Sequence, residues 1–452
     1  MQPIGRAGAL FLLILATLLV APIHARQGTT ISVASSTAQP DFPNRITFAL
    51  SAASSAADIR EVQLLYGATR SGALTLVDLP LKANLQVTLS HQLDTQVYYY
   101  PPGTEITYRW VIRDAAGNTL ESEPQRVVYH DERFNWSERT VRNVTVYWYK
   151  GGDAFGDVLA AAVDRALAHL QAELGTNLTK SVRIYVYATN RDMRSALQAN
   201  SEEWIGGQAN PTLGVIVATI AAGDETGARR IIPHELSHQV LNQAVENPYG
   251  GIPPWFDEGL AVHNQEVRDI DYDQMIVQAA EENRLIPLEA LSSTFPADPE
   301  QARLSYAQSR DMVEHIIATY GEAKLQAMVV AFAAATPVDE AVQGVLGHSV
   351  DELDAEWRKG QPKPSGPTPD LVGPQVAPAD RFRDRPVLPV GAAASSSSTP
   401  FEDRPPTFIG WLASLPTWAT LSAAAVCCIT GVLILGTVLL IGLRLVGVDK
   451  RI

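Results

Sequence analysis

The stretch RRIIPHELSHQVLNQAV, from Arg229 to Val245, is the most informative part of this 452-residue chain. It holds two of the nine histidines, His234 and His238, four residues apart, with Glu235 directly after the first. Residues four apart lie on one face of an α-helix, so both imidazoles can be aimed at one point. Two neutral imidazoles suit a zinc ion, and Glu235 projects to the side, where it can reach a water on that ion. The stretch therefore predicts a helix that carries two metal ligands and a general base.

The same pattern has a simpler interpretation, an ordinary amphipathic helix with two solvated histidines. Pro233 bears on where the helix begins, because proline is tolerated in the first turn of a helix or at a kink. We therefore expect the helix either to start close to Ile232 or to bend there.

A catalytic zinc site needs a third protein ligand and an open position for water. The stretch PPWFDEGLAVHNQ, residues 253–265, offers Glu258, which follows His238 by twenty residues. A loop between two helices is indicated by Pro248, Gly250, Gly251, Pro253 and Pro254. The second helix can then return Glu258 to the metal beside both histidines.

At this point the chain resembles the gluzincins, the zinc metallopeptidases whose third ligand is a glutamate on the next helix. HELSHQ followed by WFDEGLA is most similar to the aminopeptidase branch and to bacterial peptidase-MA-like domains, over approximately residues 141–358. The resemblance implies Zn²⁺ bound by His234, His238 and Glu258, which makes a water more acidic and polarises the substrate carbonyl. It implies that Glu235 takes the proton of that water and hands it to the leaving amine.

Three further stretches resemble these families more weakly. Residues 204–220, WIGGQANPTLGVIVATI, lie where the families place the edge strand that pairs with an extended substrate. Residues 304–321, LSYAQSRDMVEHIIATYG, resemble the downstream helix, and residues 348–359 the closing helix. Tyr306 is expected to face the cleft and to donate a hydrogen bond to the oxyanion, with a structural role as its alternative. His315 is a second candidate donor, and His263 is either a support for a ligand or a surface residue.

Two departures from the family patterns affect these expectations. The aminopeptidases hold the amino terminus of the substrate with the glutamate of a Gly-Ala-Met-Glu-Asn motif, whereas GGQAN, residues 206–210, has no acid there. This difference argues against an exopeptidase. Thermolysin has an aspartate four residues after its third ligand, where this chain has Val262. The group that would orient a ligand histidine is therefore not identified by the sequence.

The rest of the chain predicts an α+β fold class. Residues 27–132 alternate apolar and polar side chains, as in TEITYRWVIRD at 104–114, and their about seven short strands suggest an immunoglobulin- or fibronectin-like β-sandwich. A gluzincin-type domain is expected over residues 134–359, with strands first and helices afterwards. In it, residues 153–175 carry apolar side chains at helical spacing and end at Gly175.

Both ends of the chain look non-globular. Residues 1–25 have the layout of a secretory signal peptide, with an uncleaved anchor as the alternative. Residues 360–406, rich in Pro, Ser and Gly, predict a disordered linker, and the uncharged residues 420–443 predict one transmembrane helix. Basic residues in the tail, 444–452, place that tail in the cytoplasm by the positive-inside rule.

Charge and cysteine content restrict the partners and the compartment. The net charge of −14 argues against nucleic acid as a partner. Both cysteines, Cys427 and Cys428, lie in the predicted membrane helix, so no disulfide is expected outside it, which suits a bacterial cell surface. We therefore expect a membrane-anchored, extracytoplasmic zinc metallopeptidase acting on peptides or proteins. The alternative is an inactive, peptidase-like binding or sensor ectodomain.

Overall fold

The structure is a computed structural model that describes residues 30–197, 206–247, 249, 251–296 and 298–363. The predicted signal peptide, membrane helix and cytoplasmic tail, and nearly all of the predicted linker, lie outside these residues, and they stay predictions, as do the domain boundaries. Among the described helices none is by itself long and apolar enough to span a membrane. One pair, Pro299–Tyr320 with Glu322–Ala333, meets the length and composition criteria jointly, with a bend of 118° between the two helices.

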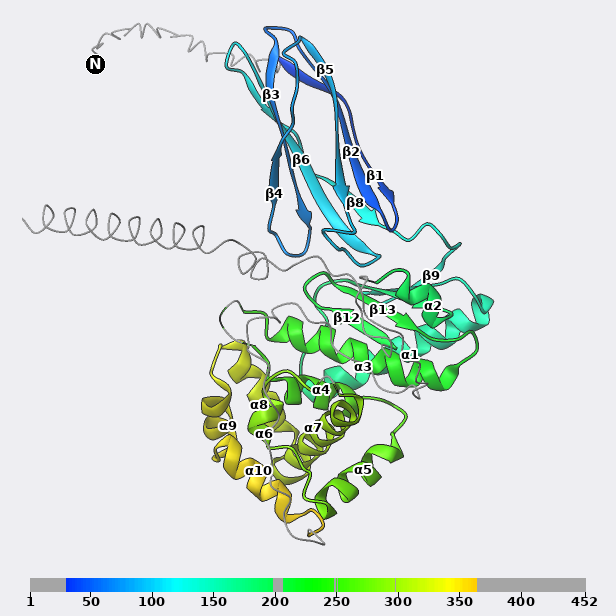
Figure 1. Cartoon of the computed structure of the whole chain (residues 1–452), viewed down its shortest axis with the longest axis vertical. Helices are drawn as coiled ribbons and strands as arrows, with labels where there is room; N and C mark the ends of the chain where they lie inside the picture. Colours follow the sequence, from blue (N-terminus) through cyan, green and yellow to red (C-terminus); the bar gives the residue numbers. More distant parts are fainter. Residues whose placement is uncertain (1–29, 198–205, 248, 250, 297, 364–452) are drawn as a thin grey trace, which may run out of the picture. The chain divides into compact units, whose positions relative to one another are not determined.

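The first eight strands form two antiparallel sheets (Figure 1). One sheet has the order β1-β2-β5, and the other has the order β4-β3-β6-β7, with β8 also paired to β6. Their bounds are β1 (Ile31–Asp41), β2 (Arg45–Ser54), β3 (Ile59–Ala68), β4 (Thr75–Asp78), β5 (Gln86–Asp94), β6 (Thr104–Asp114), β7 (Thr119–Glu121) and β8 (Gln125–Tyr129).

The two sheets bury one apolar core, as the alternating pattern predicts. In β6 every second residue from Ile106 to Ile112 is buried, while the residues between them are only partly covered. These side chains belong to the same core as Phe48 of β2 and Leu64 of β3. The expected packing of two sheets is thus observed, and the immunoglobulin or fibronectin type stays a prediction.

A third sheet has five strands in the order β12-β13-β11-β10-β9. Its strands are β9 (Ser137–Val141), β10 (Val144–Trp148), β11 (Val182–Tyr187), β12 (Gly207–Asn210) and β13 (Val215–Thr219). The three central strands are parallel, and the edge strands β9 and β12 are antiparallel to their neighbours. The short strand β12 is therefore an edge of the sheet, as expected for a strand that could pair with a substrate.

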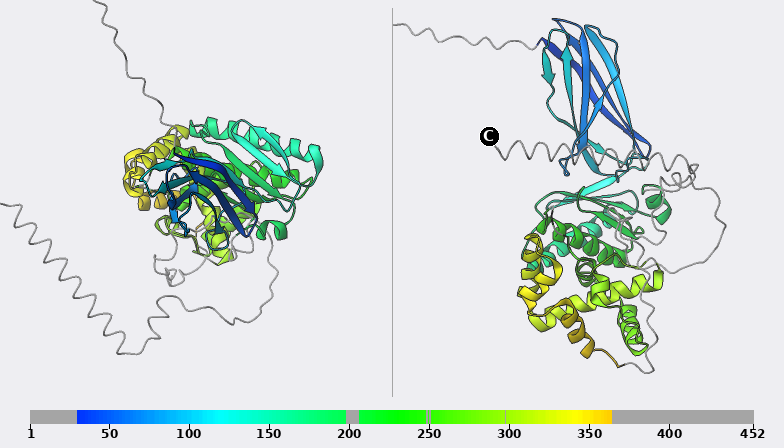
Figure 2. Two further views of the ribbon diagram at one scale, coloured as in Figure 1. Left: turned by 90° about the horizontal axis from the view of Figure 1, so that it is seen from above. Right: turned by 60° about the vertical axis from the view of Figure 1, so that its left-hand side comes forward.

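Helix α1 (Gly152–Leu174) makes the crossover between the parallel strands β10 and β11. Its predicted apolar stripe is buried, from Phe155 to Leu174, and the left-handed Gly175 ends it at φ 66°. A connecting helix, α2 (Asn190–Arg194), follows β11. Figure 2 shows helices covering one face of the five-stranded sheet, and α1 packs there beside α3 (Glu225–Ala244).

The opposite face of this sheet carries Tyr185 and Tyr187, which join the core of the first eight strands. Between β8 and β9, the fully buried Asp131 accepts a hydrogen bond from the Tyr187 hydroxyl at 2.6 Å. It also accepts hydrogen bonds from Arg133 Nε at 2.8 Å and Nη2 at 2.7 Å. Asp131 thus satisfies several donors at the segment that joins the two sheet regions.

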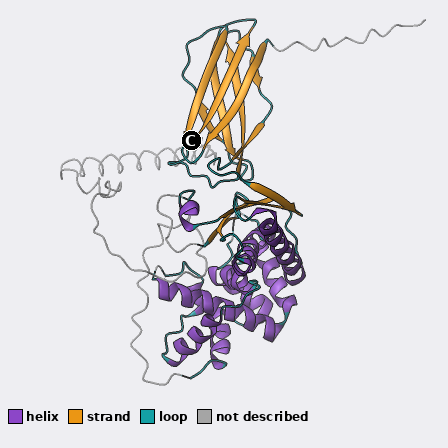
Figure 3. Cartoon of the chain, turned by 90° about the vertical axis from the view of Figure 1, so that its right-hand side faces the viewer, coloured by secondary structure: helices purple, strands orange, loops and turns teal. Residues whose placement is uncertain are grey.

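The remainder of the described chain is helical (Figure 3). Its elements are α4 (Pro254–His263), α5 (Ile270–Glu281), α6 (Leu288–Leu291), α7 (Pro299–Tyr320), α8 (Glu322–Ala333), α9 (Val338–Leu346) and α10 (Val350–Lys359). Strands first and helices afterwards is the predicted α+β order.

The position at which α3 begins contradicts one of the two predictions made from Pro233. A start close to Ile232 is wrong, because α3 begins at Glu225, where Asp224 caps it by accepting the N–H of Gly227 at 2.8 Å. Pro233 therefore lies inside the helix and has no N–H to offer the Arg229 carbonyl one turn earlier. That carbonyl instead accepts a hydrogen bond from the backbone N–H of Glu266 at 3.1 Å. This bond connects the segment after α4 to α3.

Candidate metal centre

The three predicted ligands converge in the interior. His234 and His238 on α3 are 2% and 1% exposed, and Glu258 on α4 is 5% exposed. Glu258 Oε2 lies 3.7 Å from His234 Nε2 and 3.6 Å from His238 Nε2. The two rings are nearly perpendicular, with centroids 5.0 Å apart. The residues therefore present one carboxylate oxygen and two imidazole nitrogens to a single point.

The hydrogen bonding of these atoms fits a metal ion. Across the described residues, His234 Nε2, His238 Nε2 and Glu258 Oε2 are buried and have no hydrogen-bond partner. Buried polar atoms are nearly always satisfied, so three orphaned ones facing each other need an explanation. Tetrahedral zinc with ligands at about 2.0–2.1 Å places its ligand atoms about 3.4 Å apart, close to the distances observed here. The donor set of two imidazoles and a carboxylate is one that zinc accepts.

Helix α4 holds Glu258 in place through a close helix crossing. A Cβ atom on Gly259 would lie 2.3 Å from the backbone oxygen of Ser309 and 2.9 Å from Val313 Cγ2, both on α7. Only glycine allows the two backbones to come this near. The fully buried Trp255 and Phe256 anchor the first turn of α4. The position of Glu258 thus depends on the packing of α4 against α7.

Two residues that the sequence did not single out orient the ligand histidines. His238 Nδ1 lies 2.8 Å from Asp257 Oδ1, and His234 Nδ1 lies 3.1 Å from the side-chain amide of Gln265. A hydrogen bond at Nδ1 fixes the ring so that Nε2 faces the metal position. The thermolysin-like position, Val262, is instead a buried apolar residue. The sequence indicated Asp257 only by its place directly before Glu258, the proposed third ligand.

The charges in the centre favour a cation. Burial and the neighbouring His238 lower the pKa of His234 well below its ordinary value, so this imidazole is neutral. Burial disfavours a charged His238, but the carboxylates of Asp257 and Glu258 outweigh it and raise its pKa to about 10. Burial raises the pKa of Glu258 well above its ordinary value. Both raised pKa values mean that His238 and Glu258 each hold a proton in the absence of a metal, and a cation bound where the ligand atoms meet would displace these protons.

Glu235, the predicted general base, lies next to the edge strand β12. It is 2% exposed, and burial raises the pKa of its carboxyl to about 7. Its Oε2 has no partner within the described part of the chain. A Cβ on Gly207 would lie 2.5 Å from Glu235 Oε1, so β12 passes directly beside this carboxylate.

The other three candidate residues, Tyr306, His315 and His263, are not among the three converging ligands. Tyr306 is 4% exposed on α7 and packs edge-on against Phe295, with ring centroids 5.3 Å apart. His315 Nδ1 lies 3.4 Å from Thr319 Oγ1 on the same helix. His263 contacts Glu173 and Glu314 rather than the residues of the metal centre.

Tyr272 is a buried donor that sequence reasoning missed. Its side chain on α5 is fully buried, and its hydroxyl has no hydrogen-bond partner among the residues described. Burial and then the charge of Asp269 raise its pKa, and Glu258 adds to the shift. No sequence pattern distinguished it from other core tyrosines.

One comparison with known proteins covers the part of the chain that contains this site. Residues 161–360 match the family model of the Peptidase MA superfamily, a stretch that contains both motif helices. The match supports the gluzincin-like peptidase domain that the sequence predicted. No curated protein matches the chain.

Several solved structures show a low likeness. An aminopeptidase N family protein from Idiomarina loihiensis has 9% identity and a TM-score of 0.34, with 72% of this chain and 75% of that chain covered. Legionella pneumophila aminopeptidase A, solved with aspartic acid, has 8% identity and a TM-score of 0.32, with 74% and 50% covered. A polysaccharide deacetylase from Bacillus cereus has 10% identity, a TM-score of 0.19, and 37% and 54% covered, so the chain spans about half of its length. These TM-scores are too low to bear on fold or activity.

Proposed function

We propose that the chain is a zinc metallopeptidase that cleaves peptide bonds within peptides or proteins. The observation that carries this proposal is the convergence of three buried, unpartnered ligand atoms, from His234, His238 and Glu258, next to the buried carboxyl of Glu235. Ordinary core packing gives no reason for four such side chains to gather in one place.

The proposed roles follow from the positions of the side chains. His234, His238 and Glu258 would hold the ion, and Asp257 would keep Nε2 of His238 turned toward it. A zinc ion held there supplies Lewis acidity toward a substrate carbonyl and a water molecule. Glu235 accepts the proton of the attacking water and delivers it to the leaving amine. Its pKa of about 7 suits a group that must both take up and release a proton near neutrality.

The substrate would lie along β12. This strand is an edge of the five-stranded sheet and passes Glu235 at Gly207, so a peptide paired to it would bring its backbone to the base. The strand residues GQAN, 207–210, include no acid that could hold a free amino terminus. We therefore propose an endopeptidase.

The oxyanion donor is proposed to be Tyr306. Stabilisation of the developing negative charge needs a donor near the metal, and α7, which carries Tyr306, packs directly against α4. A Tyr306→Phe variant should lose about 10²–10³-fold in kcat with zinc content unchanged. An unchanged kcat would contradict the oxyanion role and would favour a structural role for Tyr306.

The location of the enzyme is also a proposal. It rests on the composition of residues 1–25, 360–406 and 420–443, which predict export, a stalk and one membrane helix with a cytoplasmic tail. The peptidase domain would then act on the outer side of a bacterial membrane. Protease accessibility of the domain in intact cells would test this orientation.

The decisive test of catalysis is Glu235→Gln in the full chain, with Glu281→Gln as control, because Glu281 is an exposed glutamate of α5. Zinc content by atomic emission and cleavage of a broad peptide library would be measured for both variants and for wild type. We expect unchanged zinc in all three and loss of cleavage, by about 10²–10⁴-fold, in Glu235→Gln alone. Equal cleavage by Glu235→Gln and wild type would contradict the proposal. A zinc-loaded wild type that cleaves nothing would favour the binding or sensor alternative.

A further inference from the structure

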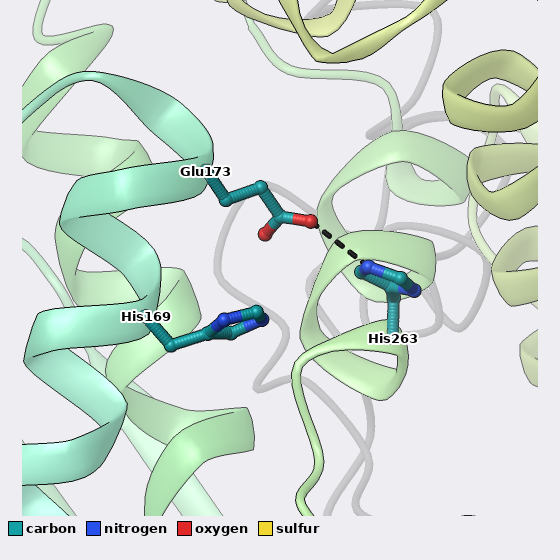
Figure 4. A group of neighbouring side chains, drawn as sticks. All are labelled: His169, Glu173 and His263. Atoms are coloured by element: carbon teal, nitrogen blue, oxygen red, sulfur yellow. Dashed lines mark ion pairs between the residues drawn. The ribbon is translucent and has the colours of Figure 1, made fainter.

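A second group of metal-ligating side chains lies outside the candidate centre (Figure 4). His169 and Glu173 come from α1, and His263 is the last residue of α4. One ring nitrogen of each histidine and one carboxylate oxygen of Glu173 all lie within 4.8 Å of one another. His169 and Glu173 are four residues apart and therefore share a face of α1, and Figure 4 shows both directed toward His263.

The second observation concerns Glu173. Its side chain is 5% exposed, which is rare for a glutamate on a helix that also has a solvent face. Its Oε1 lies 2.9 Å from His263 Nε2, but its Oε2 is buried and has no hydrogen-bond partner among the described residues. A buried carboxylate oxygen without a partner is costly, and an ion at this position would remove the cost.

An ion pair without any metal accounts for part of the arrangement. His263 lies between Glu173 and Glu314, with Nδ1 3.5 Å from Glu314 Oε1, and Glu314 in turn pairs with Arg268 at 2.9 Å. A protonated His263 would satisfy both carboxylates. The ion pairs involve neither Glu173 Oε2 nor the side chain of His169, which is exposed on α1.

We propose that His169, Glu173 and His263 bind a second divalent transition-metal ion of the zinc class. Two imidazoles and one carboxylate are a donor set that suits zinc, and water would complete the coordination at this partly exposed place. The ion would replace the proton between His263 Nε2 and Glu173. His263 would keep Nδ1–H for Glu314, and a carboxylate on the far nitrogen is the usual support of a metal-bound histidine.

The ion would join two helices that belong to the surroundings of the first centre. Helix α1 packs against α3, which carries His234 and His238, and α4 carries Glu258 five residues before His263. A metal clip at the end of α4 would therefore stabilise the helix that supplies the third ligand. The binding of this second ion does not rest on the proposed peptidase activity.

The test is zinc stoichiometry in the full chain after removal of metal with a chelator, measured by equilibrium dialysis against Zn²⁺. The variants are His169→Gln for the second site and His234→Gln for the first, with His348→Gln as a control at a partly exposed histidine elsewhere in the chain. We expect His169→Gln to bind one zinc fewer per chain than wild type and His348→Gln to match wild type. His234→Gln alone should still bind zinc at the second site. The double variant, with both His234→Gln and His169→Gln, should lose that zinc as well.

A second measurement separates binding from a folding defect. His169 is exposed, so His169→Gln should retain its circular dichroism spectrum, and Glu173→Gln gives an independent loss of the same zinc. In His234→Gln, added Zn²⁺ should raise Tm, since a ligand that binds only the folded state stabilises it, and this rise should vanish in the double variant. The proposal is overturned if His169→Gln binds as much zinc as wild type.

Discussion

His238 Nδ1 lies 2.8 Å from Oδ1 of Asp257, the residue directly before the proposed ligand Glu258. One turn of α4 thus supplies both a proposed metal ligand and the carboxylate that orients the ring of a second proposed ligand. Because Asp257 accepts the Nδ1 proton, Nε2, which lies 3.6 Å from Glu258 Oε2, is the nitrogen that can offer its lone pair to a metal once its own proton is displaced. The two helices of the centre are therefore coupled by a hydrogen bond as well as by the convergence of their three candidate ligand atoms.

Replacing Asp257 should weaken metal binding. In Asp257→Asn the amide cannot supply the same charge, and the ring of His238 loses its fixed orientation. We expect zinc affinity to fall by about 10–100-fold, measured by competition with a chromophoric chelator. Asp271→Asn, a change at an exposed aspartate of α5, should leave the affinity as it is. Equal affinities for both variants would show that Asp257 has no part in holding the ion.

A side chain at Gly207 should damage catalysis without removing the metal. A Cβ there would lie 2.5 Å from Glu235 Oε1, so either the carboxylate or strand β12 must shift. Misplacement of a general base by about 1 Å can cost about 10²-fold in rate, so Gly207→Ala should lose kcat/KM on that scale and keep its zinc. Gly344→Ala is the matched control, since nothing lies within 4 Å of a Cβ at that helical glycine. Wild-type activity in Gly207→Ala would show that β12 and Glu235 are not in tight contact.

The crossing of α4 and α7 should tolerate no Cβ at Gly259. The added carbon would lie 2.3 Å from a backbone oxygen, which cannot move away as a flexible side chain would. We expect Gly259→Ala to lower the free energy of unfolding by about 1–3 kcal/mol, measured by urea denaturation, and to reduce zinc affinity through Glu258. Gly344→Ala should be neutral or stabilising by up to about 1 kcal/mol, because alanine is the better helix former. A stability equal to that of wild type would mean that the two helices can separate at no cost.

Asp131 should be important for stability but not for metal binding. Asp131→Ala leaves the buried Tyr187 hydroxyl without its acceptor and Arg133 without its carboxylate. The free energy of unfolding should fall by about 2–4 kcal/mol, measured by the shift of the urea midpoint, with zinc content per folded chain unchanged. Asp58→Ala, at an exposed aspartate, should change it by less than about 0.5 kcal/mol. A small effect at Asp131 would mean that water replaces its hydrogen bonds.

Much of the local structure followed from periodicity. The alternation in β6 and the helical spacing in α1 predicted which residues are buried, because a strand and a helix each present one face to a core. The spacing of apolar residues did not predict that α3 begins about two turns before Pro233. The Arg229 carbonyl, which the proline leaves without its helical donor, accepts the backbone N–H of Glu266, and Glu266 belongs to a later segment that spacing within α3 cannot indicate.

The sequence by itself determined the chemistry of the centre: two imidazoles one helical turn apart, a carboxyl beside the first, and a second carboxyl after a loop. These features depend only on residue type and on the repeat of the helix. Only the tertiary structure decided which groups support them, Asp257 and Gln265, and that His263 meets Glu173 rather than the first centre. The reason is physical: contacts between separate helices depend on how closely and at what angle they cross. Here the crossing brings Gly259 of α4 against the backbone oxygen of Ser309 on α7, fifty residues later in the chain, which local spacing cannot encode.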